Sequence, residues 1–122
     1  MDQTTLLRLH EIGIDTEELL ERCMGNEKLA CRLLLKFVDD RNYDSLTDAL
    51  AANDTEKAIA AAHALKGMCG NLSMKRLQTL FETELTLLRG GDVAAARELF
   101  GEASAVYTET RLALPSLLGP IG

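Results

Sequence analysis

The sequence predicts an all-α fold, an antiparallel up-down-up-down four-helix bundle with two short N-terminal helices capping one end. Apolar residues recur at three- and four-residue spacing along most of the chain, as they do in amphipathic helices. The chain contains only two prolines and no tryptophan, a composition that favours long uninterrupted helices. The four long periodic segments are separated by loops of about two to four residues, and helices joined by such short loops must be antiparallel neighbours.

Two short helices are expected before the bundle. Leucines recur at helical spacing in residues 4–11, and Gly13 ends this first helix. Asp15 and Glu18 then form a capping-box pattern at the start of a second short helix, which stops at Gly25. We expect this pair of helices to cover one end of the domain.

The first two long helices are predicted from their start signals and apolar periodicity. Asn26 is the expected N-cap of a single helix that continues to Leu50. Asn53 and Glu56 form a second capping box, which starts a helix that ends near Asn71.

The last two long helices have equally local signals. Ser73 is the expected N-cap of the third long helix, which ends at Gly90. Asp92 is the expected N-cap of the fourth, which Pro115 closes. Residues 116–122 are expected to form a loose tail.

The length of 122 residues predicts a single domain with its own core. Within it we expect short N-terminal helices in residues 1–25, the four-helix bundle in 26–115 and the tail in 116–122. No second catalytic domain is expected.

Charge and composition limit the classes of partner. A formal net charge of −6 works against binding to nucleic acid or to an anionic membrane. No apolar run is long enough to span a membrane, and the N-terminus lacks the cationic start of a signal peptide, so we expect a cytoplasmic monomer. Three cysteines without a C-x-x-C pair fit neither a disulfide framework nor a zinc site and are interpreted as small buried hydrophobic residues.

The predicted second long helix carries two distinct stripes. Its apolar stripe belongs to the core, and a second stripe lies about 130° around the helix, so that it faces away from the core. The second stripe consists of His63, Lys66, Gly67 and Gly70. A glycine inside a helix costs about 1 kcal/mol relative to alanine, which a merely solvated face does not require. We therefore predict an outward histidine beside a lysine, on a surface bare of Cβ atoms that another molecule can approach closely.

This segment resembles the signature of histidine-containing phosphotransfer (HPt) domains, which reads approximately A-H-x-L-K-G-x-x-G-N. Residues 62–71 read A-H-A-L-K-G-M-C-G-N. The flanking chain is also similar to the family, with Gly-Ile-Asp at 13–15, Phe37 in the first long helix and Gly-Asp at 91–92. The resemblance covers residues 13 to about 114 and implies a helical-bundle architecture.

The resemblance implies a phosphorelay intermediate of two-component signalling. His63 would accept a phosphoryl group from an aspartate of a receiver domain and pass it to another receiver. Lys66 would stabilise the charge of the phosphoryl oxygens, and Gly67 and Gly70 would allow close approach of the receiver. The expected partners are receiver domains of response regulators and a hybrid sensor kinase.

The same resemblance implies a phosphocarrier without kinase activity of its own. The chain needs no cofactor in this role, because Mg²⁺ and the aspartyl phosphate belong to the receiver. The only paired glycines, at 90–91, fall in a helix–helix turn without the lysine and strand of a nucleotide-binding loop.

One position departs from the family pattern. Many HPt domains place a Gln or Glu on the helix after the histidine helix, where it orients the imidazole. That position is Leu85 in this chain, and Glu84 is one residue off, so its side chain points about 100° away. The orienting group is then absent, replaced by water, or restored by a shift of the loop at 71–73.

Several alternatives remain open at this point. The chain could be a phosphoacceptor module excised from a larger sensor kinase, although the initiating Met1 favours a freestanding protein, or a scaffold that binds a receiver without chemistry. A metal site in the bundle would need E-x-x-H pairs, but Ala60 precedes His63 and Leu7 precedes His10 at that spacing. No other functional residue accompanies His10, which is interpreted as an ordinary surface histidine.

Overall fold

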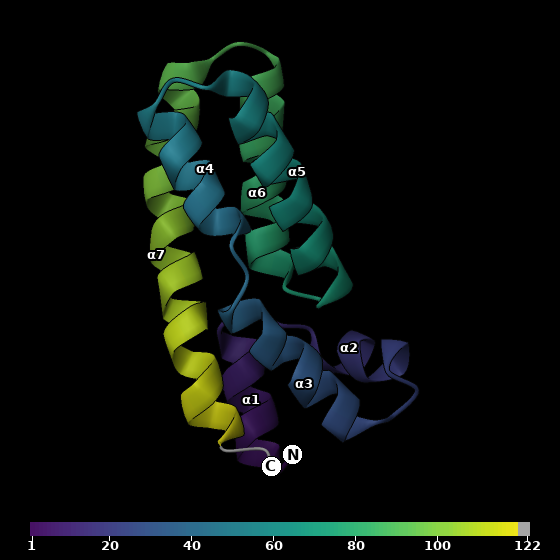
Figure 1. The fold of residues 1–122 in the computed structure, drawn as a ribbon. Coiled ribbons are helices and arrows are strands. Elements are labelled where there is room, and N and C mark those ends of the chain that lie inside the picture. Colours follow the sequence, from purple (N-terminus) through teal and green to yellow (C-terminus); the bar gives the residue numbers. More distant parts are fainter. Residues whose placement is uncertain (120–122) are drawn as a thin grey trace.

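The computed structural model describes residues 1–119, in which the regular secondary structure consists of seven α-helices (Figure 1). They are α1 (Gln3–Glu11), α2 (Thr16–Arg22), α3 (Glu27–Val38), α4 (Asn42–Ala51), α5 (Thr55–Asn71), α6 (Lys75–Arg89) and α7 (Val93–Leu118). Within the described range there is no strand, only an isolated antiparallel bridge between Ile14 and Met74. The predicted all-helical class is confirmed.

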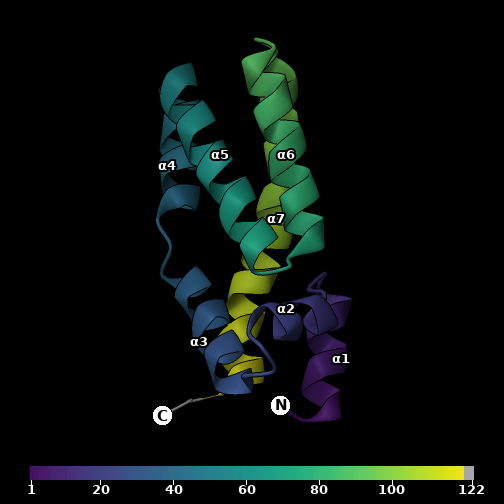
Figure 2. The ribbon, with the colours of Figure 1, turned by 90° about the vertical axis from the view of Figure 1, so that its right-hand side faces the viewer.

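The longest helix, α7, runs along the whole molecule (Figures 1 and 2). Helices α4, α5 and α6 lie beside its first half, with α5 packed between α4 and α6. Helices α1 and α3 contact its second half, and α2 contacts both of them. The molecule therefore consists of two groups of helices, which are spanned by one continuous helix and also joined by contacts of the α5–α6 turn with the segment around α2.

The prediction of one unbroken helix over residues 26–50 is wrong. The chain leaves the helix after Val38 and resumes it at Asn42. Asp40 explains the break, because its carboxylate accepts hydrogen bonds from the backbone N–H of Asn42 at 2.8 Å and from the side-chain amide of Asn42 at 3.0 Å. An aspartate that bonds to nearby backbone in this way competes with the helical hydrogen bonds, although neither glycine nor proline marks the break.

Three of the predicted N-caps are confirmed. The side chains of Asp15, Asn26 and Asp92 each accept a hydrogen bond from the backbone N–H three residues ahead, at 3.1 Å. Each bond satisfies one of the free N–H groups at the start of a helix.

Two predicted caps are wrong. Asp54, not Asn53, caps α5, since its carboxylate accepts from the N–H of Lys57 at 3.1 Å and Asn53 has a φ of 57°. Ser73 does not cap α6, which begins two residues later. Instead Ser73 is fully buried with a φ of 57°, and its hydroxyl donates to the Glu18 carboxylate at 2.9 Å, joining the α5–α6 turn to α2.

The last helix does not end at Pro115. It continues to Leu118, so the first residues of the predicted tail are helical, and 120–122 lie outside the described residues. Proline removes one helical hydrogen bond, but Pro115 lies on the exposed side while Leu114 and Leu118 are buried. Burial of leucine side chains offsets the lost bond.

All five aromatic side chains of the chain form one cluster near the α3–α4 break. Tyr107 is its centre: its ring stacks on Tyr43 with centroids 4.0 Å apart, and Phe37 and Phe81 contact it at 5.0 and 6.4 Å. Phe100 also stacks on Tyr43, at 5.5 Å. These contacts join α3, α4, α6 and α7 on both sides of the break.

Candidate functional site

His63 lies on the outward side of α5. The core side of this helix is formed by five buried residues, which are Ala58, Ala61, Ala62, Leu65 and Cys69. His63 is exposed although its neighbour Ala62 is completely buried. Of the other residues in the predicted outward stripe, Gly67 is exposed, and Lys66 and Gly70 are half-buried.

The two glycines of this stripe have different surroundings. A Cβ built on Gly67 would have no neighbour within 4 Å, so the surface one turn beyond His63 is open. A Cβ built on Gly70 would lie 3.0 Å from Nε2 of Gln78, a residue of α6. Gly67 therefore leaves space for another molecule, whereas the space beside Gly70 is limited by the chain's own glutamine.

His63 borders an open groove between α5 and the region where α3 ends. The volume of this groove is about 560 Å³. Its lining residues are Leu33, Lys36, Phe37, Asp40, His63, Ala64, Gly67, Met68, Asn71 and Leu72. Sequence reasoning missed Lys36 and Asp40 as part of this site, because only the packing of distant helices places them beside His63.

The lysines around His63 lack ion-pair partners. Among residues 1–119, neither Lys66 nor Lys36 has a carboxylate oxygen within 4.0 Å. By contrast, Lys75 pairs with Glu18 at 2.8 Å. Two lysines near His63 are thus free of ion pairs within the described residues, although the groove also contains the carboxylate of Asp40.

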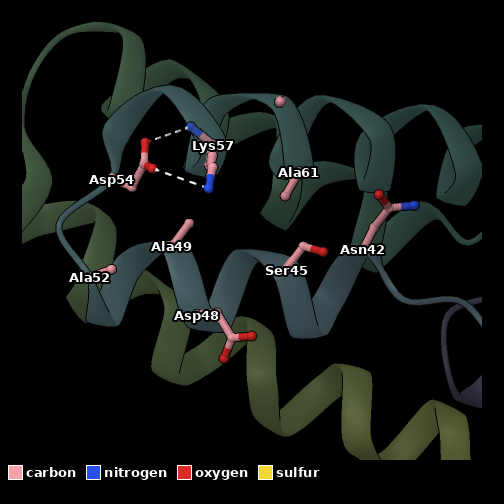
Figure 3. Close-up of a pocket in the computed structure, with 9 residues that line it drawn as sticks. Asn42, Ser45, Asp48, Ala49, Ala52, Asp54, Lys57 and Ala61 are labelled. Atoms are coloured by element: carbon pink, nitrogen blue, oxygen red, sulfur yellow. Dashed lines mark hydrogen bonds and ion pairs between the residues drawn. The ribbon is translucent and has the colours of Figure 1, made fainter.

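A second groove, between α4 and α5, differs in this respect (Figure 3). Its volume is about 500 Å³, and small and polar side chains line it. Its only lysine, Lys57, pairs with Asp54 at 3.8 Å. No histidine or cysteine lines this groove, so it offers no nucleophile comparable with His63.

The helix after the histidine helix provides no orienting group. Leu85 and Glu84 are both buried in the core. The Glu84 carboxylate oxygens have no hydrogen-bond partner, and burial raises the pKa of this carboxyl group from 4.5 to about 7. Within the described part of the chain, no side chain forms a hydrogen bond with the His63 ring.

The remaining candidates for chemistry are inert or isolated. All three cysteines are buried and free, as expected, and burial raises the pKa of the Cys69 thiol to about 12. Over residues 1–119, no three side chains of His, Cys, Asp or Glu come together in a group that could hold a metal ion. None of the described helices has the length and apolar character needed to cross a membrane.

Comparison with known proteins identified a family. The family model described as Hpt domain matches residues 32–117 of the chain. This segment contains α4, α5, α6 and most of α3 and α7, together with every residue of the groove beside His63. Neither the comparison with curated proteins nor the comparison with solved structures found a match.

Proposed function

This chain belongs to the Hpt domain family, whose members are phosphocarrier modules of two-component signalling, and we propose that it is a phosphorelay intermediate with His63 as its phosphoacceptor. One observation supports this assignment above all others. His63 is exposed on α5, next to an open surface at Gly67 and one helical turn from the cation of Lys66.

The proposed reaction is a reversible transfer between two amino-acid side chains. One nitrogen of the neutral imidazole attacks the phosphorus of a receiver's aspartyl phosphate, so that an N–P bond forms as the P–O bond to the aspartate breaks. The electron pair of the broken bond stays on the aspartate, which leaves as a carboxylate. The phosphohistidine then gives the phosphoryl group to the aspartate of another receiver by the same steps in reverse.

The site residues have separate roles in this proposal. Lys66 stabilises the charge that spreads over the phosphoryl oxygens in the transition state. Gly67 allows the receiver's loops to reach the imidazole. Gly70, the second glycine of the signature, contributes less to this approach, because Gln78 limits the space beside it. The protein requires no cofactor of its own, and the receiver brings the Mg²⁺ that the transfer needs.

The partners follow from the family. Hpt domains interact with the receiver domains of response regulators, and we propose such receivers, with a hybrid sensor kinase as a source of phosphoryl groups, as partners of this chain. We further propose that it acts in the cytoplasm as a monomer, without kinase activity and without binding nucleic acid or membranes. The proposed architecture is an up-down-up-down bundle in which α3 and α4 together form the first long segment, and α1 and α2 cap one end.

A transfer experiment with a matched histidine control tests this function. The protein is incubated with a receiver domain, Mg²⁺ and a small-molecule phosphodonor, and acid-labile phosphate on the protein is measured. We expect label on the wild type and on His10→Gln, because His10 is exposed on α1 without an accompanying lysine and glycine pair. His63→Gln should carry none.

Two results would contradict the proposal. Label that persists in His63→Gln would show that another residue is the acceptor. Receiver binding without any label on the wild type would instead support a scaffold that performs no chemistry.

A further inference from the structure

We propose that Lys36, on α3, is a second phosphoryl-binding residue of this site. When His63 carries the phosphoryl group, the Lys36 ammonium group donates hydrogen bonds to its oxygens from across the groove. This inference rests on the proposed function, since it requires His63 to be the acceptor.

Geometry is the first support. Lys36 and His63 line the same groove, from different helices. Around α5, Lys66 lies about 60° to one side of His63, whereas Ala64 and Asn71, which line the groove, lie about 100° and 80° to the other side. The groove that Lys36 lines therefore lies on the side of the imidazole opposite to Lys66, and Lys66 alone leaves that side of the phosphoryl group without a cation.

Charge is the second support. Lys36 is exposed, and none of the carboxylates in residues 1–119 lies within 4.0 Å of its ammonium group. The nearest acid along the chain in the same groove is Asp40, one helical turn further on. Both oxygens of Asp40 already accept hydrogen bonds from Asn42. Those bonds come from neutral groups and leave the charge of Asp40 in the groove, so the support from charge is that the Lys36 ammonium group has no ion-pair partner among the described residues.

The groove also has the size that this role requires. Its volume of about 560 Å³ lies within the range of about 300–1,000 Å³ that is typical of small-ligand sites. A bound phosphoryl group carries a charge of roughly −1.5 to −2, so two cations neutralise it better than one. Lys36 exchanges no atom in this role, and the only bonds that form and break are those of the transfer between His63 and the aspartate.

The test measures the rate of transfer from a phosphorylated receiver over a range of receiver concentrations. Lys36→Gln should lower the maximal rate about tenfold and leave the half-saturating receiver concentration unchanged. We expect a smaller effect than loss of a donor in a closed active site, because solvent screens charges in an open groove. Lys36→Arg, which keeps the charge, should recover most of the rate.

The matched control is Lys28→Gln, which removes an exposed lysine of the same helix that does not line the groove. It should transfer at the wild-type rate, and circular dichroism should show that every variant is folded. If Lys36→Gln and Lys28→Gln lowered the transfer rate equally, the cause would be the change in net charge and not a contact made by Lys36. An effect confined to the half-saturating concentration would make Lys36 a docking residue only.

The His63→Gln variant separates the two proposals. If it loses all label and Lys36→Gln transfers at the wild-type rate, the inference about Lys36 is overturned and the proposed function stands. If His63→Gln still accepts phosphate, the proposed function fails and the role of Lys36 fails with it.

Discussion

At the scale of single residues, Gly67 is a residue of the candidate site that lowers the stability of its own helix. It lies inside α5, where alanine would favour the helix by up to about 1 kcal/mol, and a Cβ there would meet nothing within 4 Å. Packing within this chain therefore does not explain the glycine. The close approach of a receiver to His63 that we propose would require it.

This view predicts opposite effects of one substitution on stability and on transfer. Gly67→Ala should raise the free energy of unfolding by up to about 1 kcal/mol, because the backbone of the unfolded chain has less freedom to lose. The same variant should slow phosphotransfer, and the larger Gly67→Gln should slow it further. Urea unfolding and the transfer assay measure the two effects.

Gly101 is the matched control, since it lies in the exposed face of α7 and a Cβ built on it also meets nothing within 4 Å. Gly101→Ala should give a similar gain in stability and leave transfer unchanged. If Gly67→Gln transfers as fast as the wild type, Gly67 has no steric role.

At the scale of the elements, the break between α3 and α4 builds the groove beside His63. It lets α3 turn away toward α1 and α2, while Asp40 stays in the groove wall (Figure 2). The hydrogen bonds from Asn42 to Asp40 define where α4 starts. The aromatic cluster around Tyr107 then holds both helices against α7.

Removing this start signal should destabilise the protein. Asp40→Ala should lower the free energy of unfolding by about 1 kcal/mol, the usual net contribution of a side-chain hydrogen bond, because α4 has no side-chain cap of its own and Asp40 accepts the N–H of its first residue. Asp39→Ala is the comparison, because the Asp39 side chain is exposed and accepts no such bond. Urea denaturation of the three proteins measures the difference, and equal stabilities of the two variants would show that Asp40 does not define the break.

At the scale of the whole molecule, the core formed by residues 1–119 contains two buried side chains whose polar atoms have no hydrogen-bond partner in that range. The oxygens of Glu84 and the hydroxyl of Tyr107 are buried and form no hydrogen bond. Burial raises the pKa of Glu84 from 4.5 to about 7 and that of Tyr107 to about 12. The pKa of Glu84 is therefore close to neutral pH. Above this pH the carboxyl group ionises, and the core must then hold an unpaired negative charge.

Stability should consequently depend on pH through Glu84. The folded state binds the Glu84 proton more tightly than the unfolded state does. The stability that this tighter binding contributes is therefore fully present below about pH 4.5 and is lost as the pH rises through about 7. We expect Glu84→Gln to have nearly wild-type stability at pH 4.5 and to be more stable than the wild type by about 2 kcal/mol at pH 8. Urea unfolding at both values measures this.

Glu82→Gln provides the control, because Glu82 lies on the exposed side of the same helix. It should differ from the wild type by the same small amount at both pH values. A Glu84→Gln curve that runs parallel to the wild-type curve would mean that the carboxyl group titrates normally.

Features that depend on contacts between residues close in the sequence could be predicted from it, whereas features that depend on contacts between distant residues could not. The caps at Asp15, Asn26 and Asp92 were predictable because each involves a backbone N–H only three residues away. The prediction at Ser73 failed because its hydroxyl bonds to Glu18, far away in the sequence. The end predicted at Pro115 failed because burial of Leu118 outweighs the local preference.

The sequence by itself determined the helical class, three of the helix N-caps and the outward position of His63, since periodicity and capping act within one or two turns of the chain. Only the tertiary structure decided that α3 and α4 separate, that Glu84 is enclosed without a partner and that Lys36 lies across a groove from His63. Those features depend on which distant helices pack together, and a local pattern carries no information about the distance between two such surfaces.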